Sequence, residues 1–342
     1  MMTRRFYTTI FFTFLAFYVS GSISAQQNEL RMELDKIIEV AQSTSLYRDR
    51  VNWDQVRDST YVLAGKATGF AQLAPALNYL LESLGDEHGR IFYNNQVIAY
   101  YYSGQLKEHQ IGFDPMLYGQ VQSGQPYTFE ALLLKDHIGY IRMPGLPMGD
   151  NMLMAKNIQD KVCELTEKGA DRWIIDLRYN GGGNMNPMVE GLTAILGDGS
   201  VGGAEGLTAA DNIIWEIRDG DFYNDGYSIL LPEECRDASG QRVAVLTSLY
   251  TVSSGEALAV IFKGRAQTRF FGARTLGMVT GTSWDVISDS VTVSISTNFY
   301  KDRNGKVYRN YVDVDEEIQS IHSPEMIDEP CILRAMAWIE KD

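Results

Sequence analysis

The sequence of 342 residues predicts a mixed α/β protein in which an N-terminal helical unit is followed by an α/β core. Two patterns carry this prediction. Apolar residues recur at helical spacing from Asn28 to about Leu84, and beyond His137 short apolar runs alternate with longer amphipathic segments. The composition, 45% hydrophobic and 22% charged, is ordinary for a globular protein, and the length suffices for a large core plus a smaller unit.

The first 25 residues have the features of a secretory signal peptide. Arg4 and Arg5 precede an apolar stretch, residues 6–19, and small residues follow it up to Ala25. We expect cleavage between Ala25 and Gln26, which would export the mature protein to the periplasm or the extracellular space. Retention of the stretch as an N-terminal anchor is the alternative. No later segment approaches the roughly 18 apolar residues of a membrane-spanning helix, so no membrane span is expected after cleavage.

The mature chain is predicted to contain four parts. Residues 26–90 are expected to form a helical domain, and residues 91–135, which glycine and proline interrupt, a short mixed linker segment of strands and loops. Residues 136–330 are expected to form the core, and residues 331–342 a C-terminal tail. Within the core the apolar runs predict, in order, a strand at 138–143, a helix at 151–168, a strand at 172–177, a helix at 188–196, a strand at 243–246, a helix at 257–263 and β-structure at 290–300.

The charge balance excludes some partners. The formal net charge is −14, and removal of Arg4 and Arg5 with the signal segment, which holds no acidic residue, changes it to −16. Such an acidic surface argues against nucleic acid and anionic membrane faces as partners.

Cysteine and histidine usage gives no sign of a metal or other cofactor. Three cysteines, Cys163, Cys235 and Cys331, are compatible with one disulfide and a spare thiol or with three buried thiols, and their spacing does not pair them. The four histidines are scattered and lack the spacing of zinc ligands. They are His88, His109, His137 and His322.

Two serines stand where a predicted strand turns into a helix. Ser253 and Ser254 follow the strand at 243–246 and precede the helix at 257–263. A serine there has its hydroxyl at a helix N-terminus, where free N–H groups and the positive end of the helix dipole stabilise an oxyanion. This position suits a nucleophile. The alternative is that one of these serines only caps the helix.

Three consecutive glycines follow the predicted buried strand at 172–177. Gly181, Gly182 and Gly183 allow the backbone to approach a ligand closely and to direct N–H groups into a small volume. An oxyanion hole, a phosphate cradle and a purely structural tight turn are the three interpretations. The phosphate cradle lacks the Gly-Lys-Ser/Thr and Gly-x-Gly-x-x-Gly patterns of known nucleotide sites.

His88 lies in a glycine-flanked turn, residues 84–90, at the end of the helical segment. A single loop histidine is usually a solvated surface group. Because imidazole changes its charge near neutral pH, His88 is also the natural general base for a serine nucleophile.

Taken together, these segments resemble the C-terminal processing (tail-specific) serine peptidases, a family that includes the tricorn core. Asp176–Gly183 is similar to the family's Asp-Leu-Arg-x-Asn-x-Gly-Gly signature, and Ser253–Glu256 to its Ser-Ala-Ser/Ala-Glu turn. Gly272–Gly277 resembles the Gly-Glu-x-Thr-x-Gly segment, and Val312–Asp315 stands where the family has Val-x-Pro-Asp. The resemblance covers about residues 80 to 320 and implies a peptidase core of the ClpP/crotonase-like α/β type.

The resemblance also implies roles for individual residues. Met278 occupies the place of the lysine in the Ser-Lys branch, so the chain is similar to the Ser-His-Glu branch, with Ser253 as nucleophile and His88 as base. Backbone N–H groups of Gly182 and Ser254 would form the oxyanion hole.

The acid of that branch would align with Tyr308, which leaves Asp313, Asp302 or Glu256 as the open choices. Only about 45 residues separate the helical unit from the core, which leaves no room for a peptide-binding PDZ domain.

Together with the signal segment and the lack of metal-ligand spacing, the resemblance predicts an exported serine endopeptidase that acts on a peptide or unfolded protein without a cofactor. A non-catalytic ligand-binding relative of the same fold, similar to the retinoid-binding proteins, is the alternative. A relative of the crotonase enzymes is disfavoured by export, since coenzyme A thioesters are cytoplasmic.

Overall fold

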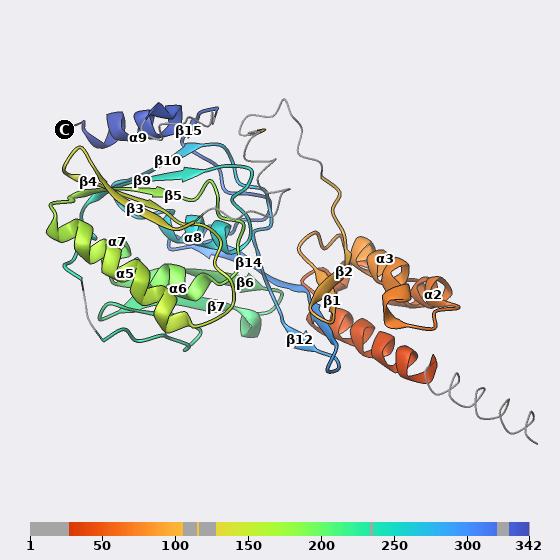
Figure 1. Ribbon diagram of the computed structural model, residues 1–342. Coiled ribbons are helices and arrows are strands. Elements are labelled where there is room, and N and C mark those ends of the chain that lie inside the picture. The colour runs from red at the N-terminus through yellow and green to blue at the C-terminus, as the bar shows by residue number, and fades with distance from the viewer. Residues whose placement is uncertain (1–26, 105–114, 116–127, 233–234, 320–327, 342) are drawn as a thin grey trace, which may run out of the picture. The chain divides into compact units, whose positions relative to one another are not determined.

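The structure, a computed structural model, describes residues 27–104, 115, 128–232, 235–319 and 328–341 (Figure 1). The chain divides into two compact units. Among the described residues, the first unit contains those up to Ser103 together with Thr282–Thr297, and the second contains all the others. Each unit is described by itself.

The first unit is built on helices, as the periodicity predicts. Residues 27–44 are helical, and η1 (Arg48–Arg50), α2 (Trp53–Ala64), η2 (Phe70–Leu73) and α3 (Ala74–Leu84) follow. On α3 the apolar stripe of Leu77, Leu80 and Leu81 is completely buried. The helix ends at Gly85, whose φ of +69° is a left-handed conformation that favours glycine.

A small antiparallel sheet completes this unit. Its strands β1 (Arg90–Tyr93), β2 (Gln96–Tyr100), β12 (Asp285–Val286) and β13 (Val291–Ser294) are ordered β12-β13-β1-β2. Ile91, Ala99 and Val293 pack into the core of the helices. These strands belong to the same hydrophobic core as the helices, so this unit includes residues beyond 90.

The second unit is organised around a six-stranded sheet. It contains β3 (Glu130–Leu134), β4 (Ile138–Arg142), β5 (Arg172–Asp176), β9 (Arg242–Thr247), β10 (Thr268–Gly272) and β15 (Glu316–Glu317), in the order β15-β10-β9-β5-β4-β3. Only β3 is antiparallel to its neighbour. The central strands are almost continuously apolar because both faces of a largely parallel sheet are covered.

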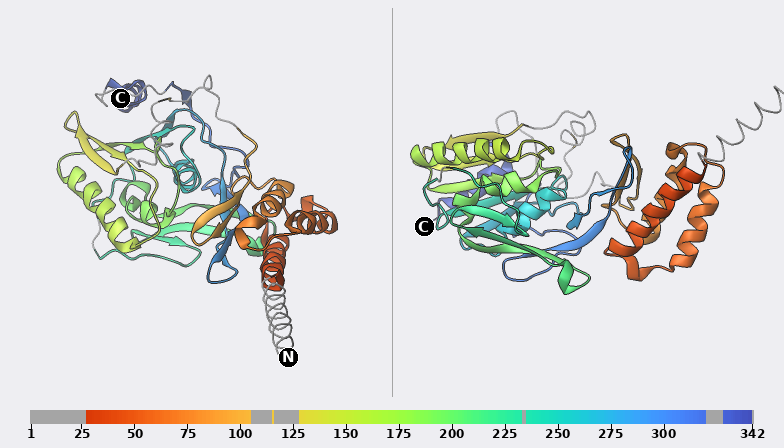
Figure 2. Two further views of the ribbon diagram at one scale, coloured as in Figure 1. Left: turned by 45° about the vertical axis from the view of Figure 1, so that its right-hand side comes forward. Right: turned by 90° about the horizontal axis from the view of Figure 1, so that it is seen from below.

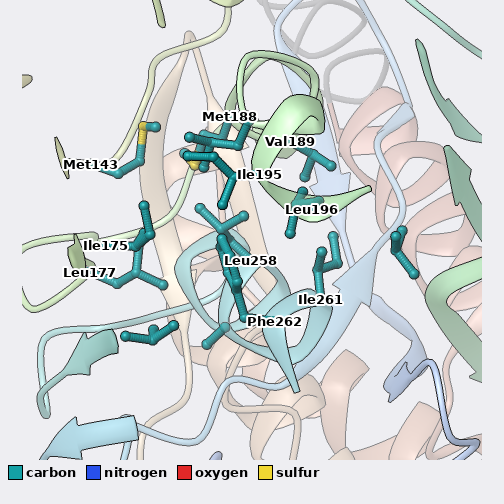
Figure 3. Packing of buried hydrophobic residues seen from close by; sticks show 14 of the residues in the cluster. Met143, Ile175, Leu177, Met188, Val189, Ile195, Leu196, Leu258, Ile261 and Phe262 are labelled. Carbon is teal, nitrogen blue, oxygen red and sulfur yellow. The ribbon is translucent and has the colours of Figure 1, made fainter. Parts of the chain in front are cut away.

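Helices cover both faces of this sheet (Figures 1 and 2). On one side lie α5 (Asn151–Glu167), α6 (Met185–Glu190), α7 (Thr193–Leu196) and α8 (Ser254–Phe262). Figure 3 shows Leu258 and Phe262 of α8 in one apolar cluster with Ile175 of β5. On the other side α9 (Pro330–Ile339) packs on Ile174 and Leu246.

A second sheet of this unit was not foreseen from the sequence, apart from β14 (Ser296–Asp302). Its other strands are β6 (Gly199–Gly206), β7 (Ile213–Arg218), β8 (Asp221–Asn224) and β11 (Thr280–Thr282), in the order β11-β14-β6-β7-β8. The glycine-rich β6 has no apolar alternation to reveal it. A Cβ on Gly203 would lie 2.1 Å from the Ile213 carbonyl oxygen, so the close approach to β7 requires glycine. The short helix η3 (Ala209–Asp211) joins β6 to β7.

The C-terminal part of this unit contains α9. Residues of α9 are buried against the main sheet, including Ile332, Ala335 and Ile339. A disulfide joins Cys163 of α5 to Cys235, with 5.1 Å between their Cα atoms, while Cys331 is a buried thiol whose pKa burial raises to about 11. In the described part of the chain no helix is both long and apolar enough to span a membrane.

Candidate active site

Ser253 lies in the turn between β9 and α8 with an unusual backbone. Its φ of +54° and ψ of −116° are rarely adopted by a residue with a side chain, and such conformations cost about 1–3 kcal/mol and cluster at functional sites. A strained turn between a strand and a helix is also how α/β hydrolases expose a nucleophilic serine. Ser254, by contrast, is helical and buried, and its hydroxyl donates to the Gly183 carbonyl at 2.6 Å. The structure thus separates the two serines by conformation and by exposure.

Glu256 holds this turn in place. Its Oε2 accepts the Ser253 N–H at 2.9 Å, and its Oε1 accepts the Thr275 hydroxyl at 2.5 Å and the Gly277 N–H at 2.8 Å. Complete burial raises the pKa of Glu256 to about 7, and the hydrogen bonds act in the opposite direction. Both oxygens are therefore engaged in fixing the serine turn to the segment at 275–277.

Tyr300 contributes a group that the sequence reasoning missed. Its hydroxyl, from β14, lies within hydrogen-bonding reach of the Ser253 side chain. Burial, and after it the charge of Glu256, raises the pKa of Tyr300 above its usual value, so the phenol is neutral at working pH. No local motif marks this tyrosine, because it reaches Ser253 only through the pairing of strands.

The glycine loop after β5 lies directly against the serine turn. Gly182 has a φ of +98°, and a Cβ there would lie 2.9 Å from the Cβ of Ser253. Gly183 has a φ of +100°, and its Cβ would lie 2.0 Å from the Leu146 carbonyl oxygen. Only glycine fits between these neighbours. Ser253, Ser254 and Gly182, three of the predicted site residues, are thus brought together.

The N–H groups of this region differ in availability. The Gly182 N–H already donates to Asn180 Oδ1 at 3.0 Å. The N–H groups of Gly183 and Ser254 donate to no acceptor among the described residues. Two backbone donors near Ser253 are therefore open to a substrate oxygen.

A buried ion-pair cluster supports the start of the glycine loop. Arg178 Nη2 lies 2.6 Å from Asp176 Oδ2, and its Nη1 lies 2.6 Å from Glu329 Oε2. The Tyr140 hydroxyl donates to Asp176 Oδ2 at 2.8 Å. Asp176 and Arg178 of the signature are therefore fixed in the buried base of the loop.

The remaining predicted site residues have separate surroundings. His88 is half-buried in the turn between α3 and β1 and belongs to the first unit. Asp302, in the second unit, accepts the Tyr308 hydroxyl at 3.0 Å and two N–H groups of its own hairpin. Asp313 is exposed, and Glu256 serves the serine turn. No group of three or more metal-ligating side chains occurs among the described residues.

Comparison with known proteins gives a family and several similar structures. The sequence pattern of peptidase family S41 matches residues 137–319, which is more than half of the chain. The nisin-resistance protein of Lactococcus lactis subsp. lactis is 30% identical over 138 residues, which are 40% of this chain and 43% of that protein. This chain thus matches less than half of that relative's length.

Three solved structures share the fold over nine-tenths of the chain or more. A lipoprotein from Streptococcus agalactiae has a TM-score of 0.66 at 18% identity and covers 91% of this chain and 96% of its own. A putative peptidase from Parabacteroides merdae has a TM-score of 0.60 at 17% identity, and the match covers 91% of this chain and 97% of that one. The photosystem II D1 C-terminal processing protease has a TM-score of 0.54 at 18% identity, with 90% and 96% covered.

Proposed function

Because the chain belongs to peptidase family S41, we propose that it is a serine endopeptidase in which Ser253 is the nucleophile and His88 the general base. The observation that carries this proposal is the strained backbone of Ser253 at the N-terminus of α8, with the glycine loop packed against it. The predicted resemblance to C-terminal processing peptidases is confirmed at the level of the family, and the mixed α/β fold with it.

In the proposed mechanism Ser253 Oγ attacks the carbonyl carbon of a peptide bond while His88 takes the hydroxyl proton. The carbonyl oxygen becomes an oxyanion, held by the Ser254 N–H and by a loop glycine, either Gly182 as the resemblance implies or Gly183, whose N–H is open. One such donor lowers the barrier by about 3–4 kcal/mol. His88 then gives its proton to the leaving amine, and water hydrolyses the acyl-enzyme by the reverse sequence.

A lysine base is disfavoured by the segment that follows the nucleophile. Met278 stands where the Ser-Lys branch has its lysine, and a thioether accepts no proton at working pH. Of the three candidate acids, Glu256 has both oxygens engaged and Asp302 serves its hairpin. Of the three, the exposed Asp313 is therefore the least committed carboxylate.

Export and a peptide substrate are parts of the same proposal. The predicted signal segment supports export, and so do two similar proteins, one described as a lipoprotein and one as a nisin-resistance protein. Nisin is consequently one peptide to test beside unfolded proteins. The acidic surface of the mature chain would attract a cationic substrate.

The test is incubation with casein and with nisin, followed by mass spectrometry of the products. We expect new peptides with the wild type and none with Ser253→Ala or His88→Ala, because each change removes a group that moves the proton or forms the acyl bond. Ser43→Ala, which removes an exposed helix hydroxyl, is the matched control and should cleave like the wild type. Undiminished cleavage by either site variant would contradict the assignment. Absence of cleavage by the wild type would favour the non-catalytic binding alternative, which Tyr308 at the place of the acid already suggests.

A further inference from the structure

The turn that carries His88 is built around a completely buried carboxylate. Asp86 Oδ1 accepts the N–H of His88 at 3.2 Å and of Gly89 at 2.9 Å, so the carboxylate fixes the backbone on both sides of the imidazole. The same side chain accepts two hydrogen bonds from Ser296, the hydroxyl at 2.6 Å and the N–H at 2.9 Å. Four donors thus converge on one aspartate within the first unit.

The conformation of the turn is restricted at both of its ends. Gly85 closes α3 in the left-handed region, with its N–H donating to the Glu82 carbonyl at 2.9 Å. At the other end a Cβ on Gly89 would lie 2.8 Å from Leu81 Cδ2 and 2.9 Å from Asp86 Oδ2. The His88 backbone therefore has little freedom.

Arg90 constrains the carbonyl groups of the same turn. Its Nη1 donates to the Glu87 carbonyl at 2.8 Å and to the Gly89 carbonyl at 2.7 Å. Asp86 thus binds the N–H groups of residues 88 and 89, and Arg90 the carbonyls of residues 87 and 89. The peptide groups on either side of His88 are therefore fixed by two side chains, those of Asp86 and Arg90.

Closing α3 does not require a buried carboxylate, because Gly85 already does so, and burying a charge is costly unless several donors satisfy it. We propose that Asp86, assisted by Arg90, is a positioning residue that holds the His88 imidazole in the orientation needed for proton transfer. This inference rests on the proposed function, in which His88 is the base. Asp86 acts through the backbone of His88 and is not itself a catalytic residue.

The first test is steady-state kinetics of Asp86→Asn on a peptide that the wild type cleaves. Asparagine keeps the shape of the side chain but replaces one acceptor oxygen by a donor that faces the Ser296 N–H. We expect kcat to fall about 10- to 100-fold with KM within about twofold of the wild type, because misplacement of a catalytic group acts on the chemical step. Asn52→Ala, which removes the α2 cap in the same unit, is the control and should change neither constant.

A second variant covers the case in which Asp86→Asn does not fold. Ser296→Ala removes only one of the four donors to Asp86, and we expect kcat to fall about 3- to 10-fold with KM unchanged. The ring proton resonances of His88 in the NMR spectrum should shift in both variants, whereas those of His137 should not. If His88→Ala is inactive while Asp86→Asn and Ser296→Ala keep the wild-type kcat, the positioning role is wrong and the proposed base stands. If His88→Ala is fully active, both proposals are wrong.

Discussion

At the scale of single residues, the local signals for Ser253 and for the glycine loop could be read from the sequence because each is a short stretch next to a predicted strand. The strand-to-helix turn and the three glycines depend only on neighbouring residues, and the structure places them in contact. The Tyr300 hydroxyl could not be found this way. It reaches Ser253 from a strand 47 positions later in the chain, and its place depends on the register of β14 against β6.

We predict that Tyr300→Phe lowers kcat/KM about 2- to 10-fold, because the hydroxyl beside Ser253 is lost. The ring itself keeps its packing against Trp215, with 5.6 Å between the ring centroids. Tyr308→Phe is a matched control, because its buried hydroxyl bonds to Asp302 and not to Ser253. Steady-state kinetics of both variants provide the measurement. A wild-type rate for Tyr300→Phe would show that the phenol has no part in orienting Ser253.

At the scale of elements, the strands and helices with strong local patterns were predicted and those defined by long-range contacts were not. β5, β9 and α8 agree with the predicted segments at 172–177, 243–246 and 257–263. The predicted helix at 188–196 is divided into α6 and α7 near Gly191, where a Cβ would lie 2.5 Å from Ile158 of α5. That interruption reflects close packing between helices, which no single segment of sequence reveals.

The helix α9 matters to the site through the residue that precedes it. Glu329 pairs with Arg178, which is buried beside Asp176 at the base of the glycine loop. We predict that Glu329→Gln lowers the free energy of unfolding by about 1.5–3 kcal/mol, because a buried guanidinium loses a charged acceptor.

Urea denaturation of this variant beside Glu340→Gln is the measurement. Glu340 pairs with Lys135 at the surface, so its substitution should cost no more than about 1 kcal/mol. Equal effects of the two substitutions would show that the buried pair contributes no more than a surface one.

At the scale of the whole molecule, buried carboxyl groups give the folding free energy a dependence on pH. Burial raises the pKa of Glu190 to about 7, from an ordinary value of 4.5, and its Oε1 has no hydrogen-bond partner among the described residues. A carboxyl group whose pKa is higher in the folded chain binds more protons when folded. The free energy of unfolding therefore falls as the pH rises through the window from 4.5 to 7. A carboxylate that is paired with lysines at the surface behaves in the opposite way. For Glu164, hydrogen bonds to Lys161 and Lys168 lower the pKa to about 2.

We predict that in Glu190→Gln the fall in the free energy of unfolding between pH 4.5 and 7 is smaller by about 1–3 kcal/mol than in the wild type. The amide does not ionise, and it can still accept the Phe222 N–H. Urea denaturation at a series of pH values measures the effect, with Glu216→Gln, whose partly exposed carboxylate pairs with Arg218, as the control. An unchanged slope in Glu190→Gln would mean that this carboxyl is not the titrating group.

The Cys163–Cys235 disulfide has a consequence for a protein that would work among cleaved chains. It closes a covalent ring across a sequence separation of 72 residues, and this ring contains the glycine loop, β6, β7 and β8. After a single backbone cut within the ring, the disulfide still joins the two pieces of the chain, so no fragment is released. Self-cleavage within the ring would add only one water to the mass of the molecule, and the two pieces would separate only after the disulfide is reduced.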